Sequence, residues 1–259
     1  MTDKKNSTTD EPVSASVDPA EIAHFSAMAA TWWDPNGPFK PLHKLNPTRI
    51  GYAKDSLCSH FKRNPHKDLP LSGLRILDIG CGGGLLSEPI CRLGATIIGA
   101  DASEKNIKTA QAHAHDMALD IDYRNVTAED LADSGEKFDA ILNMEVIEHV
   151  ADIPSFLNAC HSLLKDEGCM VMSTLNRTAK SWAMAIAGAE YIMRWLPKGT
   201  HDWHKFLKPS ELVRALGNSH FETTDLKGMV YHPFSGEWSL DDKDFSVNYL
   251  VLAQKTQNG

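Results

Sequence analysis

A glycine-rich stretch between an apolar run and a helical segment most strongly limits how this chain can fold. Residues 74–79 form an apolar run typical of a buried strand, and a glycine cluster follows it in Asp78-Ile79-Gly80-Cys81-Gly82-Gly83-Gly84. The next residues, 85–93, have the pattern of a helix. A strand that passes into a helix through glycines is typical of the first unit of a ligand-binding α/β sheet.

The rest of the chain repeats this alternation of strands and helices. We expect further strands over residues 96–100, 121–124, 138–143 and 169–173, and helices over 103–118 and 154–164, with Gly168 as a helix stop. After an interruption from residue 177 to 208, one more helix over 209–216 and two strands close the sheet. This order predicts an α/β, Rossmann-like fold: a mostly parallel sheet with helices on both faces.

Two helices are expected before the first strand. The first places Ile22, Phe25, Ala29, Trp32 and Trp33 on one face and ends before residue 35. The second spans residues 48–61, and both precede any strand, which indicates a cap. We therefore divide the chain into a disordered tail (1–18), an N-terminal helical cap (19–70) and an α/β domain (71–256) with an inserted segment (177–208).

Composition limits the class of partner and the compartment. The net charge of −8 argues against a protein that binds nucleic acid, because such proteins normally carry a basic surplus. The five cysteines are scattered without a C-x-x-C pair, and the first eighteen residues lack the apolar core of a signal peptide. We expect a protein of the reducing cytoplasm.

The glycine loop and one acidic residue indicate the ligand. A dinucleotide fingerprint that starts at Gly80 would require glycine where Leu85 stands. Asp101 ends the next strand, where a carboxylate can accept hydrogen bonds from both ribose hydroxyls. Two plainer interpretations stay open: a tight turn without a ligand, and an aspartate that only neighbours a helix N-cap.

The loop together with Asp101 resembles the S-adenosylmethionine site of class I methyltransferases. The resemblance implies that Gly80 and Gly82 approach the cofactor and that the following helix offers amides to its carboxylate. It also implies that residues 126–131, with Ala128 and Glu129, line the adenine pocket. Met144 would touch the sulfonium end or the adenine edge, although plain packing explains this methionine equally well.

The residues after the fourth expected strand bear on the reaction. The sequence there is Asn143-Met144-Glu145-Val146, which lacks the [D/N]-P-P-[Y/F] pattern of base N-methyltransferases, so an oxygen or carbon acceptor is favoured. Glu145, Glu148 and His149 share one face if a helix begins here. Three roles stay open: a metal site, a general base without metal, and a structural role. Two carboxylates suit Mg²⁺, whereas a histidine ligand fits Zn²⁺ or Fe²⁺ better.

Further segments resemble the family of ubiquinone-biosynthesis O-methyltransferases from about residue 22 to residue 252. They are Trp32-Trp33-Asp34, Phe39-Lys40-Pro41-Leu42-His43, Asn46-Pro47-x-Arg49-x-Gly51-Tyr52, Ser173-Thr174-Leu175-Asn176-Arg177, Lys180-Ser181-Trp182, Gly188-Ala189-Glu190-Tyr191, Pro197-Lys198-Gly199-Thr200-His201-Asp202 and Val247-Asn248-Tyr249. The resemblance implies methylation of two polyprenyl phenols, 2-polyprenyl-6-hydroxyphenol and 3-demethylubiquinol. It also implies that Arg49 holds the cofactor's carboxylate, and contact with other ubiquinone-biosynthesis enzymes stays open.

The inserted segment is apolar with basic flanks. Residues 181–189 carry no charge, and residues 177–208 have a local charge of +4 inside an acidic chain. The apolar part is too short to span a bilayer, which needs about twenty residues. We expect residues 181–196 to contact a membrane surface, which places the protein peripherally on the inner face of the membrane. The alternative is a helix packed on the sheet or at a dimer interface.

Three other functions remain open at this point. The chain could methylate oxygen or carbon of another small molecule. A nicotinamide oxidoreductase shares the fold class, although Leu85 speaks against it. A non-catalytic subunit could retain the cofactor pocket, although Glu145, Glu148 and His149 argue against it.

Overall fold

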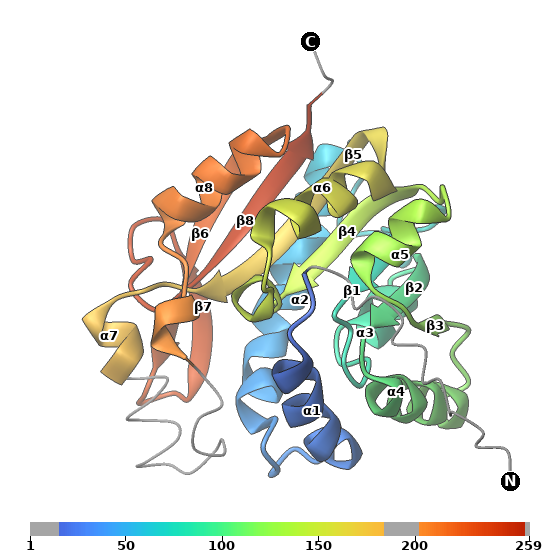
Figure 1. Ribbon diagram of the computed structural model, residues 1–259, viewed down its shortest axis with the longest axis horizontal. Helices are drawn as coiled ribbons and strands as arrows, with labels where there is room; N and C mark the ends of the chain where they lie inside the picture. Colours follow the sequence, from blue (N-terminus) through green and yellow to red (C-terminus); the bar gives the residue numbers. More distant parts are fainter. Residues whose placement is uncertain (1–15, 184–201, 257–259) are drawn as a thin grey trace, which may run out of the picture.

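The computed structural model describes residues 16–183 and 202–256 (Figure 1). In this part of the chain one mixed sheet contains eight strands in the order β3-β2-β1-β4-β5-β8-β6-β7. The strands are β1 (Arg75–Ile79), β2 (Thr96–Asp101), β3 (Asp122–Asn125), β4 (Phe138–Met144), β5 (Leu164–Leu175), β6 (Phe221–His232), β7 (Glu237–Asp241) and β8 (Asn248–Lys255). β1 to β5 pair in parallel, whereas β8, β6 and β7 are antiparallel to their neighbours.

Helices lie on both faces of this sheet (Figure 1). The helical elements are α1 (Pro19–Met28), η1 (Ala29–Thr31), α2 (Lys40–His60), α3 (Ser87–Arg92), α4 (Glu104–Asp116), α5 (Ala128–Asp133), η2 (Ile147–His149), α6 (Ile153–Leu163), α7 (Ala179–Ser181), η4 (Trp203–Lys205) and α8 (Pro209–Asn218). α5, α6 and α8 pack on one face, and α2 and α3 on the other. The predicted mostly parallel α/β fold is therefore confirmed.

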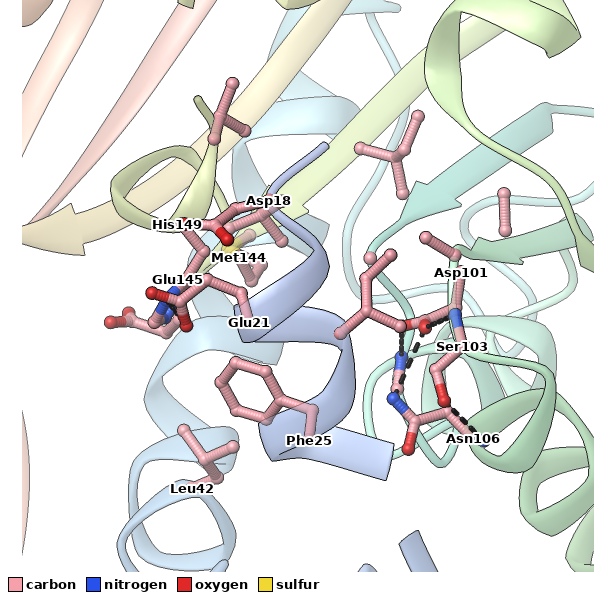
Figure 2. A pocket seen from close by; sticks show the side chains of 18 of the residues that line it. Asp18, Glu21, Phe25, Leu42, Asp101, Ser103, Asn106, Met144, Glu145 and His149 are labelled. Carbon is pink, nitrogen blue, oxygen red and sulfur yellow. Dashed lines mark hydrogen bonds and ion pairs between the residues drawn. The ribbon is translucent and has the colours of Figure 1, made fainter. Parts of the chain in front are cut away.

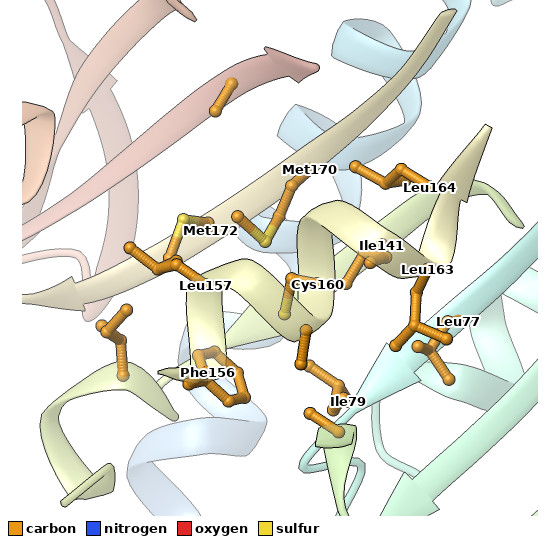
Figure 3. Close-up of a cluster of buried hydrophobic side chains, with 14 of the residues drawn as sticks. Leu77, Ile79, Ile141, Phe156, Leu157, Cys160, Leu163, Leu164, Met170 and Met172 are labelled. Atoms are coloured by element: carbon orange, nitrogen blue, oxygen red, sulfur yellow. The ribbon is translucent and has the colours of Figure 1, made fainter. Parts of the chain in front are cut away.

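The alternating direction of strand side chains divides the core between the two faces. Leu77 and Ile79 of β1 point to the face that α6 covers with Phe156 and Leu157 (Figure 3). Ile76, which directly precedes Leu77 in the sequence, points to the opposite face and packs with α2 and α3. Both faces of the central strands are thus buried, which explains why these strands read as continuous apolar runs.

Several predicted boundaries were wrong. The second helix begins at Lys40 rather than residue 48 and continues through Pro47. Leu45 and Asn46, in the turn before the proline, are already buried, so tertiary packing stabilises this additional helical part. Gly168 lies inside β5 and does not end a helix. After α8 the described chain forms three strands instead of two, since β6 and β7 form a hairpin.

The boundary of the expected tail also needs correction. Residues 1–15 lie outside the described residues, but residues 16–18 belong to the fold. Ser16 is buried and its carbonyl accepts a hydrogen bond from Ala151 N at 2.9 Å. Asp18 is the N-cap of α1, where its side chain accepts a hydrogen bond from Ala20 N. The packed chain therefore begins before residue 19.

Candidate active site

A pocket opens at the carboxyl ends of β1, β2 and β4, where the strand order reverses on either side of β1. Such a switch point is the usual ligand site of open α/β sheets. α1 lies across this pocket (Figure 2). In this view Asp101, Ser103 and Asn106 lie on one side, and Met144, Glu145 and His149 lie on the other. One pocket is thus lined by residues of both groups that the sequence singled out, whereas Glu148 lines a separate pocket.

The glycine loop takes a path that side chains would block. Gly80 and Gly82 have φ angles of 67° and 54°, in the left-handed region that glycine adopts readily. A Cβ at Gly80 would lie 2.5 Å from Val146 Cγ2, and one at Gly82 would lie 2.3 Å from Trp32 Cζ2. Both glycines line the pocket. The loop therefore brings bare backbone to the pocket wall.

Asp101 lies at the end of β2 in a network of donors. Its Oδ2 accepts a hydrogen bond from Gly82 N at 2.9 Å, and its Oδ1 accepts from Ser103 N at 2.8 Å. Asn106 Nδ2 also donates to Oδ1 at 3.3 Å, and Trp32 Nε1 donates to Asn106 Oδ1 at 3.0 Å. Burial raises the pKa of the Asp101 carboxyl group. The aspartate therefore joins the glycine loop, α4 and the N-terminal helices.

Of the four other residues predicted to contact the cofactor, two line the pocket and two do not. Met144 and Ala128 line it and are buried. Glu129 and Arg49 are not among the lining residues, but buried polar atoms of both, the Glu129 carboxylate oxygens and Arg49 Nε, have no hydrogen-bond partner in the protein. Burial lowers the pKa of the Arg49 guanidinium, while the negative charges of Glu145, Asp78 and Glu148 raise it. Unpaired buried polar groups of this kind fit a ligand with several polar groups.

The expected metal site does not form. The segment after β4 is a short 3₁₀ turn preceded by Glu145 at a φ of 55°, so the helical i, i+3, i+4 spacing that would bring the three side chains together is absent. Ser173 Oγ donates to Glu145 Oε1 at 2.7 Å, whereas Thr174 Oγ1 donates to Glu148 Oε2 at 2.8 Å. Among the described residues, no group of three His, Cys, Asp or Glu side chains is arranged to hold a metal ion.

His149 lies at the pocket wall and belongs to a different network. Its Nδ1 is 3.1 Å from Glu21 Oε2, on α1. The Phe25 ring meets the imidazole edge-on, with ring centroids 5.0 Å apart. Lys205 Nζ contacts the other Glu21 oxygen at 2.8 Å. A histidine with one nitrogen fixed by a carboxylate can offer its second nitrogen to a proton donor in the pocket.

Relatives identify the family. The chain matches the family model described as a methyltransferase domain over residues 50–226. It is 58% identical over 239 residues to the ubiquinone biosynthesis O-methyltransferase of Cereibacter sphaeroides (strain ATCC 17025), covering 92% of this chain and 97% of that protein. The enzyme of the same name from Bartonella bacilliformis is 56% identical and covers 93% and 97% of the two chains.

The chain belongs to the ubiquinone biosynthesis O-methyltransferase family. It is therefore an S-adenosylmethionine-dependent O-methyltransferase, and the alternatives of a nicotinamide oxidoreductase and a non-catalytic subunit fall away. The fold agrees with that of magnesium protoporphyrin IX methyltransferase from Synechocystis PCC 6803, a crystal structure with bound S-adenosylmethionine (TM-score 0.58, 18% identity, 94% and 100% of the chains covered). In the part of this family member that the structure describes, no helix has the length and hydropathy of a membrane span.

Sequence reasoning missed the residues that α1 and the turn after it bring to the pocket of this O-methyltransferase. Glu21, Phe25 and Trp32 all line it, although the sequence indicated only that Phe25 and Trp32 share a helix face. The one local sequence signal for these pocket residues is the aromatic pair at residues 32 and 33. Trp33 also contacts the glycine loop, where its Nε1 donates to Gly83 O at 2.9 Å. No local pattern marks Glu21, whose partner His149 is 128 residues away.

Proposed function

We propose that the enzyme transfers the methyl group of S-adenosylmethionine to a phenolic oxygen of polyprenyl-substituted catechol-type rings in ubiquinone biosynthesis. The acceptors are 2-polyprenyl-6-hydroxyphenol, which becomes 2-polyprenyl-6-methoxyphenol, and 3-demethylubiquinol, which becomes ubiquinol. The observation that supports this most is a single pocket with Asp101 on one side and His149 on the other. The names of the curated relatives point to the same pathway.

On this proposal the two sides of the pocket have separate tasks. Asp101 accepts hydrogen bonds from the ribose hydroxyls, and the backbone of Gly80 and Gly82 borders the cofactor. Ala128 and Glu129 border the adenine, and Met144 lies near the sulfonium. The Arg49 guanidinium, buried and with Nε unpaired, binds the cofactor's carboxylate. The bound cofactor supplies a methyl group that a sulfonium already activates.

The chain's own contribution to the chemistry is orientation and proton removal. A phenol with a pKa near 10 is about 0.1% ionised at pH 7, so forming the phenolate costs about 4 kcal/mol. A positioned general base contributes a factor of about 10² to 10⁴. We assign this role to His149: Nε2 takes the phenol proton while the oxygen's electron pair attacks the methyl group, whose bond to sulfur breaks so that S-adenosylhomocysteine leaves. Holding the two reactants in line supplies much of the remaining acceleration.

The apolar lining of the pocket fits such an acceptor. Phe25, Leu42 and Leu45 line the space near α1 and α2, and Tyr231 and Trp238 line it from β6 and β7. An aromatic ring with a hydrocarbon tail gains free energy from this burial at roughly 25 cal/mol per Å². A small charged acceptor would gain no comparable free energy from burial against these side chains.

Contact with a membrane surface is a further part of the proposal. It depends on residues 181–196, of which residues 184–196 lie outside the described residues. At the described edge of this segment, Trp182 is 50% exposed. Lys180 is paired with Asp244 at 2.9 Å, so this lysine is partly neutralised at the surface. The uncharged run and its basic flanks remain the main support.

Methyl transfer to short-chain analogues of both acceptors tests the proposal. The purified enzyme with S-adenosylmethionine should methylate a demethylubiquinol analogue and a 2-alkyl-6-hydroxyphenol. Repeating the assay with a chelator, and then with added Mg²⁺, decides whether a metal takes part. An enzyme that binds the cofactor but methylates neither phenol would overturn the assignment and favour another small-molecule O- or C-acceptor.

A further inference from the structure

Glu21 connects α1 to the proposed general base. Its Oε2 lies 3.1 Å from His149 Nδ1, and both side chains are largely buried at the pocket wall. We propose that Glu21, which lies on α1, is a positioning residue for His149. It fixes the tautomer and the orientation of the imidazole. The inference rests on the proposed function, in which His149 removes the proton from the acceptor.

The chemistry of the contact determines which nitrogen of His149 is free. Glu21 also accepts a hydrogen bond from the Lys205 ammonium group, so its carboxylate is ionised at neutral pH and only accepts hydrogen bonds. Nδ1 must then donate to it, which leaves the lone pair of a neutral imidazole on Nε2. After proton transfer the same carboxylate stabilises the imidazolium. Glu21 therefore favours both the reactive tautomer and the charged product of the proton transfer.

The carboxylate is itself held in place from its other side. Lys205 Nζ donates to Glu21 Oε1 at 2.8 Å and to Asp18 Oδ2 at 3.1 Å. Glu21 therefore uses Oε1 for Lys205 and Oε2 for His149. The Phe25 ring, one turn further along α1, packs edge-on against the imidazole and limits its rotation. Two side chains of one helix thus define the position of His149.

α1 also contacts the opposite side of the pocket. Ser26 Oγ and Ser103 Oγ are 2.6 Å apart, and Ser103 N donates to Asp101 Oδ1. The helix that orients the base therefore also contacts Ser103, whose backbone amide donates to Asp101, the residue assigned to the cofactor's ribose. α1 therefore contacts residues on both sides of the pocket.

Kinetics of Glu21→Gln and Glu21→Asp test the inference. The glutamine offers an amide that can donate to Nδ1 and so favour the wrong tautomer; we expect kcat to fall at least about tenfold, by analogy with Asp-to-Asn changes in histidine dyads. Glu21→Asp keeps the carboxylate and should recover part of the loss. KM for the phenol and Kd for S-adenosylmethionine should change by less than about threefold, since neither ground state uses this contact. Glu104→Gln, the same change on the exposed face of α4, is the matched control.

Two comparisons separate positioning from a merely structural role. In a His149→Ala background, Glu21→Gln should lower kcat no further, because the two residues act as a unit. An additive loss, or a parallel loss of cofactor affinity, would mean that Glu21 only holds α1 in place, and the inference would be wrong. Asp18→Asn removes the other carboxylate that contacts Lys205; a loss of kcat as large as that of Glu21→Gln would assign the effect to Lys205 instead.

The tautomer of His149 provides a test on the unmodified enzyme. ¹⁵N NMR of the wild-type protein should show the proton on Nδ1 at neutral pH, and a proton on Nε2 would overturn the inference even if the variants fail to fold. Failure of the proposed function gives a different result, namely normal turnover by His149→Ala. If His149→Ala loses most of its kcat but Glu21→Gln keeps the wild-type kcat, His149 remains the assigned general base and Glu21 is not its positioning residue.

Discussion

The indole of Trp32 lies directly against Gly82, so close that a Cβ at residue 82 would be 2.3 Å from Cζ2 of the ring. Gly82→Ala should therefore displace Trp32 and strain a backbone with a φ of 54°, a conformation that costs other residues about 1–2 kcal/mol. We expect a lower unfolding temperature and weaker S-adenosylmethionine binding in calorimetry. Gly51→Ala is the control: no atom lies within 4 Å of a Cβ there, and alanine favours the helix. Equal unfolding temperatures and equal cofactor affinities for Gly82→Ala and Gly51→Ala would contradict the close packing of Trp32 on Gly82.

Removing the Asp101 carboxylate should weaken cofactor binding. Asp101→Ala loses a charged acceptor for the ribose hydroxyls, worth about 1.5–3 kcal/mol, or roughly 10- to 150-fold in Kd. Titration calorimetry with S-adenosylmethionine measures this directly. Because Asp101 also accepts from Gly82 N and Ser103 N, circular dichroism must first show that the variant folds. Unchanged affinity in a folded variant would remove Asp101 from the cofactor site.

His149→Ala should lower kcat while Kd for the cofactor stays nearly constant. The side chain lies across the pocket from Asp101 (Figure 2), on the side that we assign to the acceptor. The loss should be about 10² to 10⁴ in kcat if the imidazole is the general base. Steady-state kinetics with a chelator present distinguishes the mechanisms: a chelator that abolishes wild-type activity, restored by Mg²⁺, would favour a metal. A normal kcat for His149→Ala would exclude both the general-base role and the metal-ligand role of this histidine.

The stability of the ligand-free protein should depend on Asp78. Burial is the main reason that the pKa of this carboxyl group rises to about 7, against an ordinary value near 3.8. Between about pH 4 and pH 7 the folded state therefore binds more protons than the unfolded state, so stability falls as pH rises through this range. The slope is at most about 1.4 kcal/mol per pH unit. Asp78→Asn should flatten it in denaturant titrations; an identical pH profile for the variant would contradict the prediction.

The segment of residues 181–196 should bind anionic membranes. Sedimentation with liposomes that contain anionic lipid should remove the protein from the supernatant at low salt, and added salt should weaken binding by screening the basic flanks. Ile186→Asp should reduce binding at little cost to thermal stability. Wild-type protein that stays in the supernatant, or an unfolded Ile186→Asp variant, would instead indicate that the segment is core or a dimer contact.

Local sequence patterns predicted the parts of the site that local backbone determines. The glycine loop and Asp101 follow from strand, turn and helix order, because parallel strands bring their carboxyl ends to one edge. The helix assumed at residues 145–149 was wrong, since Glu145 adopts a left-handed φ that no side-chain pattern announces. The contact between Glu21 and His149 was not predictable either, because only tertiary packing joins residues 128 positions apart.

The position of α1 has a practical consequence for changing what the enzyme accepts. The helix borders the acceptor side through Phe25 and Glu21, whereas the donor contacts assigned to the glycine loop and Asp101 come from the sheet. Exchanging residues 16–31 between relatives, with Glu21 and Ser26 kept because they contact His149 and Ser103, should therefore alter acceptor selectivity while the donor contacts stay in place.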